Sequence, residues 1–262
     1  MDEPNILVST DARGVATVAL NRPAIHNAFD DRLIADLTGT LQQLADDAAV
    51  RVVVLTGTGE SFSAGGDLNW MRRMAGYSDA ENFADAMALA ELLRYLNELP
   101  KPTVARVNGA AFAGGLGLVC CCDVAVAAEE AIFSISEARL GLVPATISPY
   151  VVDAIGARAA RRYFLTAERF SAAEARRIGL VHEVAPRATL DAAVEKIVAS
   201  MLEAGTGAQA RSKRLIAEVR DRPMTEALMA LTAHAIAAAR ASAEAREGLA
   251  AFFAKRKPSW RR

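Results

Sequence analysis

Apolar residues follow two different spacings along the N-terminal part of the chain. Short apolar runs at Ile6–Ser9 and Val15–Leu20 predict two strands, and Asp11–Gly14 between them predicts a hairpin turn. Leucines and isoleucines between Asp30 and Asp47 recur every three or four positions, which predicts an amphipathic helix. Val52–Leu55 is a continuous apolar run with turn residues after it, and it predicts a buried strand.

The alternation of strand and helix patterns continues downstream. The patterns predict a helix over 79–98, a strand over 104–107, a helix over 115–122 and a strand over 124–127. Strands that alternate with helices in this way indicate an α/β architecture. From about Asp191 the pattern is only helical. We therefore predict a spiral α/β core over residues 1–190 and a helical C-terminal section over residues 191–262.

Composition narrows the function classes. The chain has 262 residues, 52% of them apolar, and 30 basic against 31 acidic residues give a net charge of −1. The high apolar share excludes intrinsic disorder. The near-zero net charge makes nucleic acid an unexpected partner. The three cysteines are consecutive, Cys120 to Cys122, so they cannot form a disulfide bond between distant segments. Because the chain offers no such disulfide, a reducing compartment is expected. The acidic start Met1–Pro4 is not a signal peptide, and no apolar run is long enough to span a bilayer. We expect a cytoplasmic protein without a membrane partner.

Several familiar sites are missing from the sequence. There is no phosphate-binding loop, and the dinucleotide fingerprint that begins at Gly115 fails at Cys120. No serine stands in a nucleophile elbow. The histidines at positions 26, 182 and 234 are isolated and lack the spacing of a metal pair, so no metal is expected.

Two glycine-rich segments, Phe62–Leu68 and Asn108–Leu118, each follow a predicted strand. Glycines permit close backbone approach, and a helix that starts at such a bend directs unpaired N–H groups outward. Two such bends brought together could donate two N–H groups to one oxygen, which is an oxyanion hole. Each segment taken alone is more often a tight turn.

A third segment, Ala131–Pro144, completes a pattern that resembles the enoyl-CoA hydratase/isomerase (crotonase) superfamily. The resemblance covers nearly the whole chain and rests on Phe62–Leu68, Lys101-Pro102, Asn108-Gly109, Ala113–Gly115, Cys122-Asp123 and the pair Phe133 and Glu137. Within this superfamily, residues 67–73 and 144–149 resemble the bacterial methylglutaconyl-CoA or isohexenylglutaconyl-CoA hydratases.

The resemblance implies repeated β-β-α units wound into a spiral, with C-terminal helices that assemble trimers, often paired into hexamers. It implies an acyl-CoA thioester as ligand, with no metal or other cofactor. The oxyanion donors would be the backbone N–H groups of Gly66 and Gly114. The implied substrate-binding residues are Ala24, His26, Ala64, Asp67, Leu68, Asn69 and Gly109. Ala24 and His26 would lie along the pantetheine and nucleotide, and Leu68 and Asn69 along the CoA channel, where the family often has Lys in place of Asn69.

Two N–H donors suit chemistry that develops negative charge on a thioester oxygen, and such chemistry also needs an acid or base near the α- and β-carbons. Glu137 matches one of the two catalytic glutamates of the hydratases. The position of the second glutamate, three residues after Gly114, holds Gly117. The related dehalogenases are excluded because their nucleophilic aspartate would fall at Ala145.

Three functions remain open from the sequence. A hydratase could use Glu137 alone, and the similarity around residues 67–73 and 144–149 favours it. An isomerase needs only one carboxylate to move a proton, and Gly117 favours that reaction. A non-catalytic acyl-CoA-binding or RNA-binding protein is the third, and the net charge speaks against RNA. Arg72 and Arg73 could meet a second carboxylate on a branched acyl chain.

Overall fold

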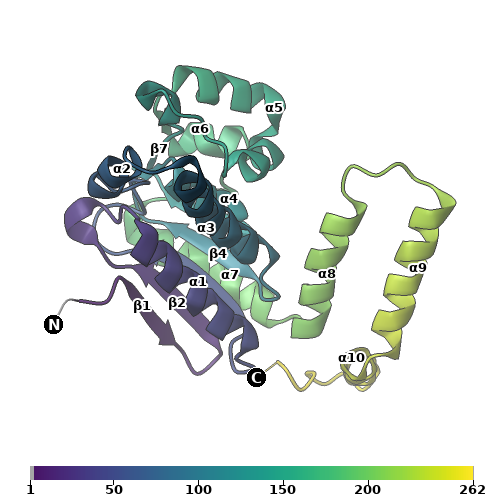
Figure 1. Cartoon of the computed structure of the whole chain (residues 1–262). Coiled ribbons are helices and arrows are strands. Elements are labelled where there is room, and N and C mark those ends of the chain that lie inside the picture. Colours follow the sequence, from purple (N-terminus) through teal and green to yellow (C-terminus); the bar gives the residue numbers. More distant parts are fainter. Residues whose placement is uncertain (1–2, 262) are drawn as a thin grey trace.

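The computed structural model describes residues 3–261 and is built on a six-stranded sheet (Figure 1). The strands lie in the order β1 (Ile6–Thr10), β2 (Val15–Leu20), β3 (Val52–Gly57), β4 (Thr103–Val107), β6 (Val124–Ala128) and β9 (Glu183–Ala185). β1 and β2 form the predicted antiparallel hairpin, and every other neighbouring pair is parallel. Parallel pairing places the carboxyl ends of β2, β3, β4 and β6 along one edge.

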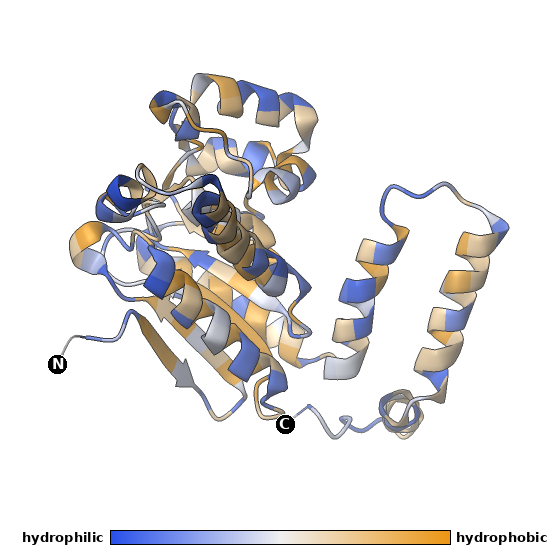
Figure 2. Ribbon diagram, in the orientation of Figure 1, coloured by the Kyte–Doolittle hydropathy of each residue, from blue (hydrophilic) through white to orange (hydrophobic). Residues whose placement is uncertain are grey.

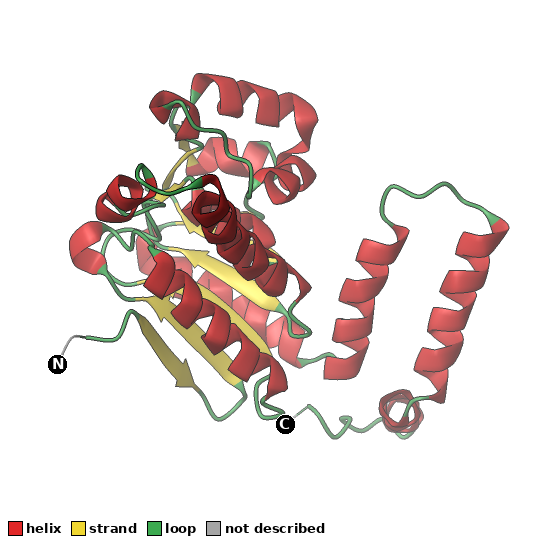
Figure 3. Cartoon of the chain, viewed as in Figure 1, coloured by secondary structure: helices red, strands yellow, loops and turns green. Residues whose placement is uncertain are grey.

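Both faces of this sheet are covered by helices (Figures 1 and 3). Val53 and Leu55 belong to the larger core cluster, together with apolar residues of α1 (Asp31–Asp46), α3 (Asp79–Glu98) and α4 (Gly114–Cys121). The alternate residues, such as Val54, pack in a second cluster against α7 (Leu190–Leu202). The period-two alternation of β-strands divides these residues between the two faces. A sheet covered on both faces explains the continuous apolar runs of its strands.

The helix boundaries follow from capping residues. The Asp30 side chain accepts the N–H of Leu33 and begins α1. Ser78 and Glu81 form a reciprocal capping box at the start of α3, which ends before Leu99-Pro100. The predicted helices over 30–47 and 79–98 are therefore confirmed to within a residue at each end.

Four of the parallel strands are each followed by a short segment that runs beside the corresponding segment of the next turn. Residues 28–29 follow β2 after a turn in which His26 and Asn27 have positive φ, segment 62–66 follows β3, segment 110–112 follows β4 and β7 (Ile132–Ser134) follows β6. Bridges Phe29↔Gly66 and Ser63↔Ala111 and the pairing of β5 (Ala111–Phe112) with β7 join them in order. The chain thus winds as a spiral whose successive turns add one rung to each of two layers.

β8 (Phe170–Ser171) pairs antiparallel with β7 and completes a second, three-stranded sheet in the order β5, β7, β8. The remaining elements lie outside these layers. They are the short helices η1 (Pro23–Ile25), η2 (Glu137–Leu140) and η3 (Arg187–Thr189), and the helices α2 (Leu68–Met74), α5 (Ser148–Thr166), α6 (Ala172–Arg177), α8 (Thr206–Val219), α9 (Glu226–Ala241) and α10 (Ala243–Phe253). Within residues 3–261 no helix combines the length and the apolar character that crossing a membrane requires.

Helices α8, α9 and α10 extend away from the sheet (Figure 1). Two ion pairs join α8 and the residue after it to the core. Lys213 Nζ lies 3.0 Å from Asp123 Oδ2, and Arg220 pairs with Asp153. In Figure 2 these helices carry apolar stretches between polar ones, and their large apolar residues are exposed, among them Ile216, Met229, Ile236, Leu249, Phe252 and Phe253.

The division at residue 191 stays a prediction as a domain boundary. The helical pattern begins there as expected, but α7 packs Leu190, Val194 and Val198 against the sheet. The part of the chain that projects from the core in Figure 1 begins with α8.

Candidate active site

The two glycine-rich segments meet at the carboxyl ends of the parallel strands. The Phe112 N–H donates to Ser63 O at 2.9 Å, which aligns the second segment beside the first. A Cβ atom at Gly65 would lie 3.0 Å from Ala113 Cβ and from Phe112 O, so the two bends are in van der Waals contact. Gly66 and Gly114 each stand one residue beyond this contact. The predicted convergence of the two bends is therefore observed.

The Gly66 amide is left without an acceptor by the pairing around it. The Phe29 N–H donates to Gly65 O at 2.8 Å, and the Asp67 N–H donates to Phe29 O at 2.9 Å. Gly66 lies between these two bonds, and its own N–H makes none within the described residues. A Cβ at position 66 would be 2.9 Å from the Cε atom of Met71, which keeps this bend narrow.

The Gly114 amide is the first of α4, and the first N–H groups of a helix have no intrahelical acceptor. A Cβ at position 114 would overlap Cζ of the buried Phe29 ring. The same residue therefore touches both bends, with its backbone beside Gly65 and its ring against Gly114. Within residues 3–261, neither a side chain nor an intramolecular acceptor competes for the two amides.

The peptide that carries the Gly114 N–H is oriented by a strained residue. Ala113 has φ 48° and ψ −123°, a region that is essentially restricted to glycine and costs of order 1–3 kcal/mol. Two hydrogen bonds hold it there: its N–H donates to Ser134 O at 2.9 Å, and its C=O accepts from the Gly117 N–H at 3.1 Å. Strain of this kind persists only where the surroundings fix the backbone.

Glu137 begins the η2 turn, three residues after Ser134, whose carbonyl binds the Ala113 amide. The Glu137 side chain is partly buried, and its Oε2 atom is inaccessible to solvent and has no hydrogen-bond partner. It is the only such carboxylate oxygen in residues 3–261. Burial raises the pKa of Glu137 above that of an ordinary glutamate because an unpaired charge is poorly solvated there. A carboxyl group of this kind is suited to accept and return a proton.

Position 117 offers no space for a second carboxylate. Gly117 is buried in α4, and a Cβ built on it would overlap Cγ2 of Ile147 and lie 3.0 Å from its Cβ. Ile147 is itself 1% exposed and stands just before α5. Gly117 stands where the resemblance implies a second glutamate, and the structure packs Ile147 against this position.

The expected CoA-contacting residues form an exposed rim beside the Gly66 bend. Ala24 lies in η1 and is exposed, and His26 is exposed with Nδ1 3.0 Å from Ser61 Oγ. Leu68, the first residue of α2, is 69% exposed although it is apolar. Asn69 is also exposed, and its Oδ1 accepts from Arg72 Nη1 at 2.8 Å.

The other three expected substrate-binding residues have clear structural contacts. The Ala64 N–H donates to His26 O at 2.9 Å. The buried Asp67 carboxylate accepts the N–H groups of Asn69 and Trp70 and so begins α2. A Cβ at Gly109 would overlap the carbonyl oxygen of Glu60. Substrate contact by any residue of the rim or of this group stays a prediction.

The two arginines of α2 have carboxylate or amide partners within the chain. Arg73 Nη2 lies 2.5 Å from Asp31 Oδ1 on α1, and Arg72 donates to Asn69. Both arginines retain exposed surface. Binding of a second substrate carboxylate would have to compete with these partners.

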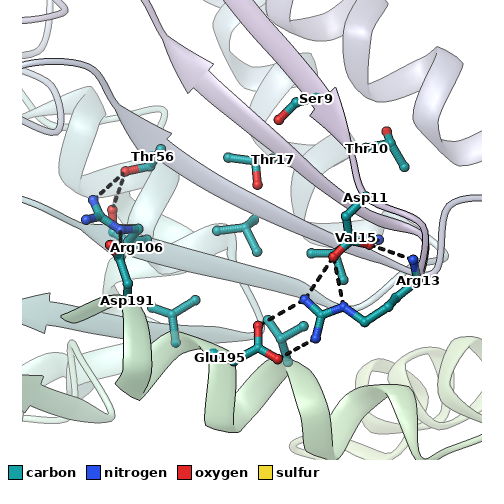
Figure 4. A pocket seen from close by; sticks show the side chains of 13 residues that line it. Ser9, Thr10, Asp11, Arg13, Val15, Thr17, Thr56, Arg106, Asp191 and Glu195 are labelled. Atoms are coloured by element: carbon teal, nitrogen blue, oxygen red, sulfur yellow. Dashed lines mark hydrogen bonds and ion pairs between the residues drawn. The ribbon is translucent and has the colours of Figure 1, made fainter. Parts of the chain in front are cut away.

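A cavity of about 450 Å³ lies on the other face of the sheet, between its strands and α7 (Figure 4). Ion pairs join Arg13 to Glu195 and, at 2.5 Å, Arg106 to Asp191, so each arginine at its edge is neutralised. Val54 and Thr56 line it, whereas Val53 and Leu55 point to the face that carries the glycine bends. This cavity is therefore separate from the candidate active site.

No cluster of three or more potential metal-ligating side chains occurs in the described part of the chain. The three cysteines are free, and burial raises the pKa of each thiol. Phe29, Ile147 and the strain at Ala113 were missed by sequence reasoning. No local sequence signal distinguishes them, because each acts through a contact with a residue at least 21 positions away.

Comparisons with known proteins agree with this geometry. Residues 10–262 match the sequence pattern of the family described as enoyl-CoA hydratase/isomerase. The crotonyl-CoA hydratase of Syntrophomonas wolfei is 32% identical over 259 residues, which covers 98% of this chain and 97% of that protein.

Solved structures give the same result. An enoyl-CoA hydratase of Shewanella pealeana superposes with a TM-score of 0.95 at 42% identity and covers 98% of this chain and 96% of its own. The enoyl-CoA hydratase of Mycobacterium smegmatis gives 0.93 at 34% identity, with 99% and 100% covered. The fold is thus that of the crotonase superfamily. The chain belongs to the enoyl-CoA hydratase/isomerase family, and it is an enzyme of the enoyl-CoA hydratase type.

Proposed function

We propose that the protein adds water across the 2,3-double bond of a 2-enoyl-CoA thioester, with Glu137 as its only acid–base group. The observation that carries this proposal is the buried, unpaired Oε2 of Glu137, three residues after the Ser134 carbonyl that binds the Ala113 amide, together with Gly66 and Gly114 amides that lack acceptors. In this assignment the thioester oxygen accepts both N–H groups, and CoA is part of the substrate. No metal or further cofactor is required.

The proton balance follows from these three groups. The oxygen of water bonds to C3 while one of its protons passes to the Glu137 carboxylate. The electron pair of the double bond moves towards the thioester oxygen, where the two amides stabilise the negative charge. Glu137, now protonated, returns the proton to C2 and regains its charge. The raised pKa of Glu137 favours the protonated intermediate form.

Isomerisation is the second candidate, and Gly117 is the observation that favours it. Two carboxylates can hold one water between them, but position 117 has no side chain. A single carboxylate suffices to remove a proton from C2 of a 3-enoyl-CoA and deliver it to C4. Both reactions use the same oxyanion donors, so the assay must separate them.

The acyl group is assigned only in part. One relative is named for crotonyl-CoA, which makes this short 2-enoyl thioester the first substrate to test. A branched acyl chain with a second carboxylate, bound by Arg72 or Arg73, is the extended form of the proposal. We expect it to require displacement of the Arg73–Asp31 ion pair or of the Arg72–Asn69 bond.

The assay follows the absorbance of the conjugated enoyl thioester after purified protein is added. Hydration of crotonyl-CoA lowers that absorbance, and isomerisation of a 3-enoyl-CoA raises it. Wild-type protein should lower it, and Glu137→Gln should not. Loss of crotonyl-CoA that is unaffected by Glu137→Gln would contradict the role of Glu137. Turnover of 3-enoyl-CoA alone would replace hydration by isomerisation.

We further propose that the protein assembles as a trimer or hexamer. The exposed apolar residues of α8 to α10 support this proposal, because a surface of that kind normally marks an interface. Light scattering at micromolar concentration should give three or six times the chain mass of 27.8 kDa. A monomer at that concentration would contradict it.

A further inference from the structure

The residue that faces Gly117 has a consequence for the choice of reaction. The geometry points to Ile147 as the specificity-determining residue that restricts this active site to one carboxylate. The inference rests on the proposed function, in which Glu137 acts alone, and it concerns why no second group assists it.

The space around Gly117 is closely packed. A built Cβ at Gly117 overlaps Ile147 Cγ2 and lies 3.6 Å from Leu93 Cδ2, so two different elements close the space above this glycine. Ile147, Leu93 and the neighbouring Leu116 are each at most 1% exposed. Because buried side chains at this density cannot move apart freely, any residue larger than glycine would strain the site.

The backbone of Ile147 has an ordinary helical conformation. It stands at the N-terminal end of α5 with φ −84° and ψ −17°, and the Val151 N–H donates to its carbonyl. This helical backbone conformation accepts any ordinary residue, and the side chain makes no hydrogen bond. The isoleucine is therefore not required for the local backbone, and a smaller residue can replace it without altering the turn.

The packing of Ile147 on Gly117 lies next to the Gly114 oxyanion donor. Gly117 lies one helical turn after Gly114, and its N–H holds the carbonyl of Ala113, the residue before the Gly114 donor. A side chain at 117 would thus start beside the oxyanion donor, but Ile147 covers it with apolar atoms. The pair Gly117–Ile147 excludes a second acid–base group and leaves Glu137 without a partner for positioning water.

The packing is tested without measuring turnover. Gly117→Ala and Gly39→Ala both place a methyl group in a helix, but a Cβ at Gly39 meets no atom within 4 Å. We expect Gly117→Ala to lower Tm by roughly 3–10 °C, as overpacking does, and Gly39→Ala to leave Tm unchanged or higher. The Ile147→Ala background removes the overlap with Cγ2 and leaves the 3.0 Å contact to Cβ and the ordinary 3.6 Å contact to Leu93. The cost of Gly117→Ala should there fall to less than half. Equal stability of Gly117→Ala and wild type would overturn the inference.

The consequence for the reaction is tested with a carboxylate. Gly117→Glu should be unstable alone, and Gly117→Glu combined with Ile147→Ala should regain stability. The double variant should raise the ratio of crotonyl-CoA hydration to 3-enoyl-CoA isomerisation by at least about tenfold over wild type. A folded double variant with an unchanged ratio would overturn the role of Ile147. Failure of the proposed function would appear instead in the wild type and Glu137→Gln, so the two failures are distinguishable.

Discussion

The two sides of the candidate active site are built in opposite ways. On one side, the Gly66 and Gly114 amides are fixed by main-chain hydrogen bonds, by the Phe29 ring and by the strained Ala113. On the other side, Glu137 projects from a single turn, and its buried Oε2 has no hydrogen-bond partner. Several independent contacts therefore fix the positions of the two N–H donors, whereas the acid–base group is supplied by the side chain of Glu137 alone.

This contrast separates what each side tolerates. Most substitutions nearby leave the position of a backbone N–H donor unchanged. The position changes only when a new side chain clashes with a rigid neighbour and displaces the main chain. A lone acid–base group fails with one substitution, and its energetics respond to pH. The predictions below apply a change to one side and leave the other intact.

Removal of the carboxyl group should have the largest effect. Glu137→Gln retains the shape of the side chain but cannot transfer a proton, so kcat should fall roughly 10²–10⁴-fold. The KM should change little, because the exposed rim that we expect to contact CoA is untouched. Steady-state kinetics on crotonyl-CoA measure both constants, with the exposed Glu129→Gln as control. A kcat within a factor of three of wild type would show that Glu137 transfers no proton.

Displacement of one backbone donor should have the next largest effect. Gly114→Ala forces a Cβ into the Phe29 ring, so the first turn of α4 must shift. Loss of one oxyanion donor lowers kcat about 10²–10³-fold. Circular dichroism must show a folded protein, because Phe29 belongs to the core. Full activity in a folded variant would place the oxyanion donor elsewhere.

The other donor should tolerate the same substitution. A Cβ at Gly66 meets the terminal Cε of Met71 at 2.9 Å, and a flexible methionine end can move aside. Gly66→Ala should therefore change kcat by no more than roughly threefold, since the N–H itself remains. Kinetics of this variant beside Gly114→Ala measure the difference between a flexible and a rigid neighbour. An equal loss in both would mean that side-chain rigidity does not decide the outcome.

The smallest effect concerns the pH dependence of stability. The pKa of Glu137 is raised by burial, so the folded state prefers the protonated form. Its contribution to stability is complete below the ordinary glutamate pKa and is lost as pH rises through the folded-state pKa. The neutral Glu137→Gln should thus melt slightly above wild type at pH 8, and the difference should shrink towards pH 4. Melting curves at both pH values test this sign, and a constant difference would contradict it.

Much of the fold follows from local patterns, because a covered parallel sheet requires apolar runs that alternate with helical spacing. The hairpin 6–20 and the helices at 31–46 and 79–98 match their predicted positions. The helices α2 and α5 were not predicted. α5 contains Pro149 and Gly156, the latter at φ 72°, which interrupt its pattern. α2 is a single short helix that depends on the Asp67 cap.

The candidate site divides in the same way. Gly66, Gly114 and Glu137 could be named from motifs, because glycine bends and an isolated acidic residue in an apolar segment are visible in the sequence. The reasons why Gly114 and Gly117 tolerate no Cβ were invisible in the sequence. They lie in Phe29 and Ile147 respectively, which reach these glycines only after the spiral has brought distant turns together.

Cys120 and Cys121 end α4, and Cys122 follows as its cap. Burial raises the pKa of the Cys122 thiol to about 12, and the pKa values of Cys120 and Cys121 are raised as well. These thiols are therefore protonated at pH 8, whereas the thiolate is the form that attacks alkylating reagents. Cys121 and Cys122 are also buried, whereas Cys120 is partly exposed. Alkylation of Cys121 and Cys122 by iodoacetamide would thus require the end of this helix to open, and its rate would report how often the helix that begins at Gly114 opens.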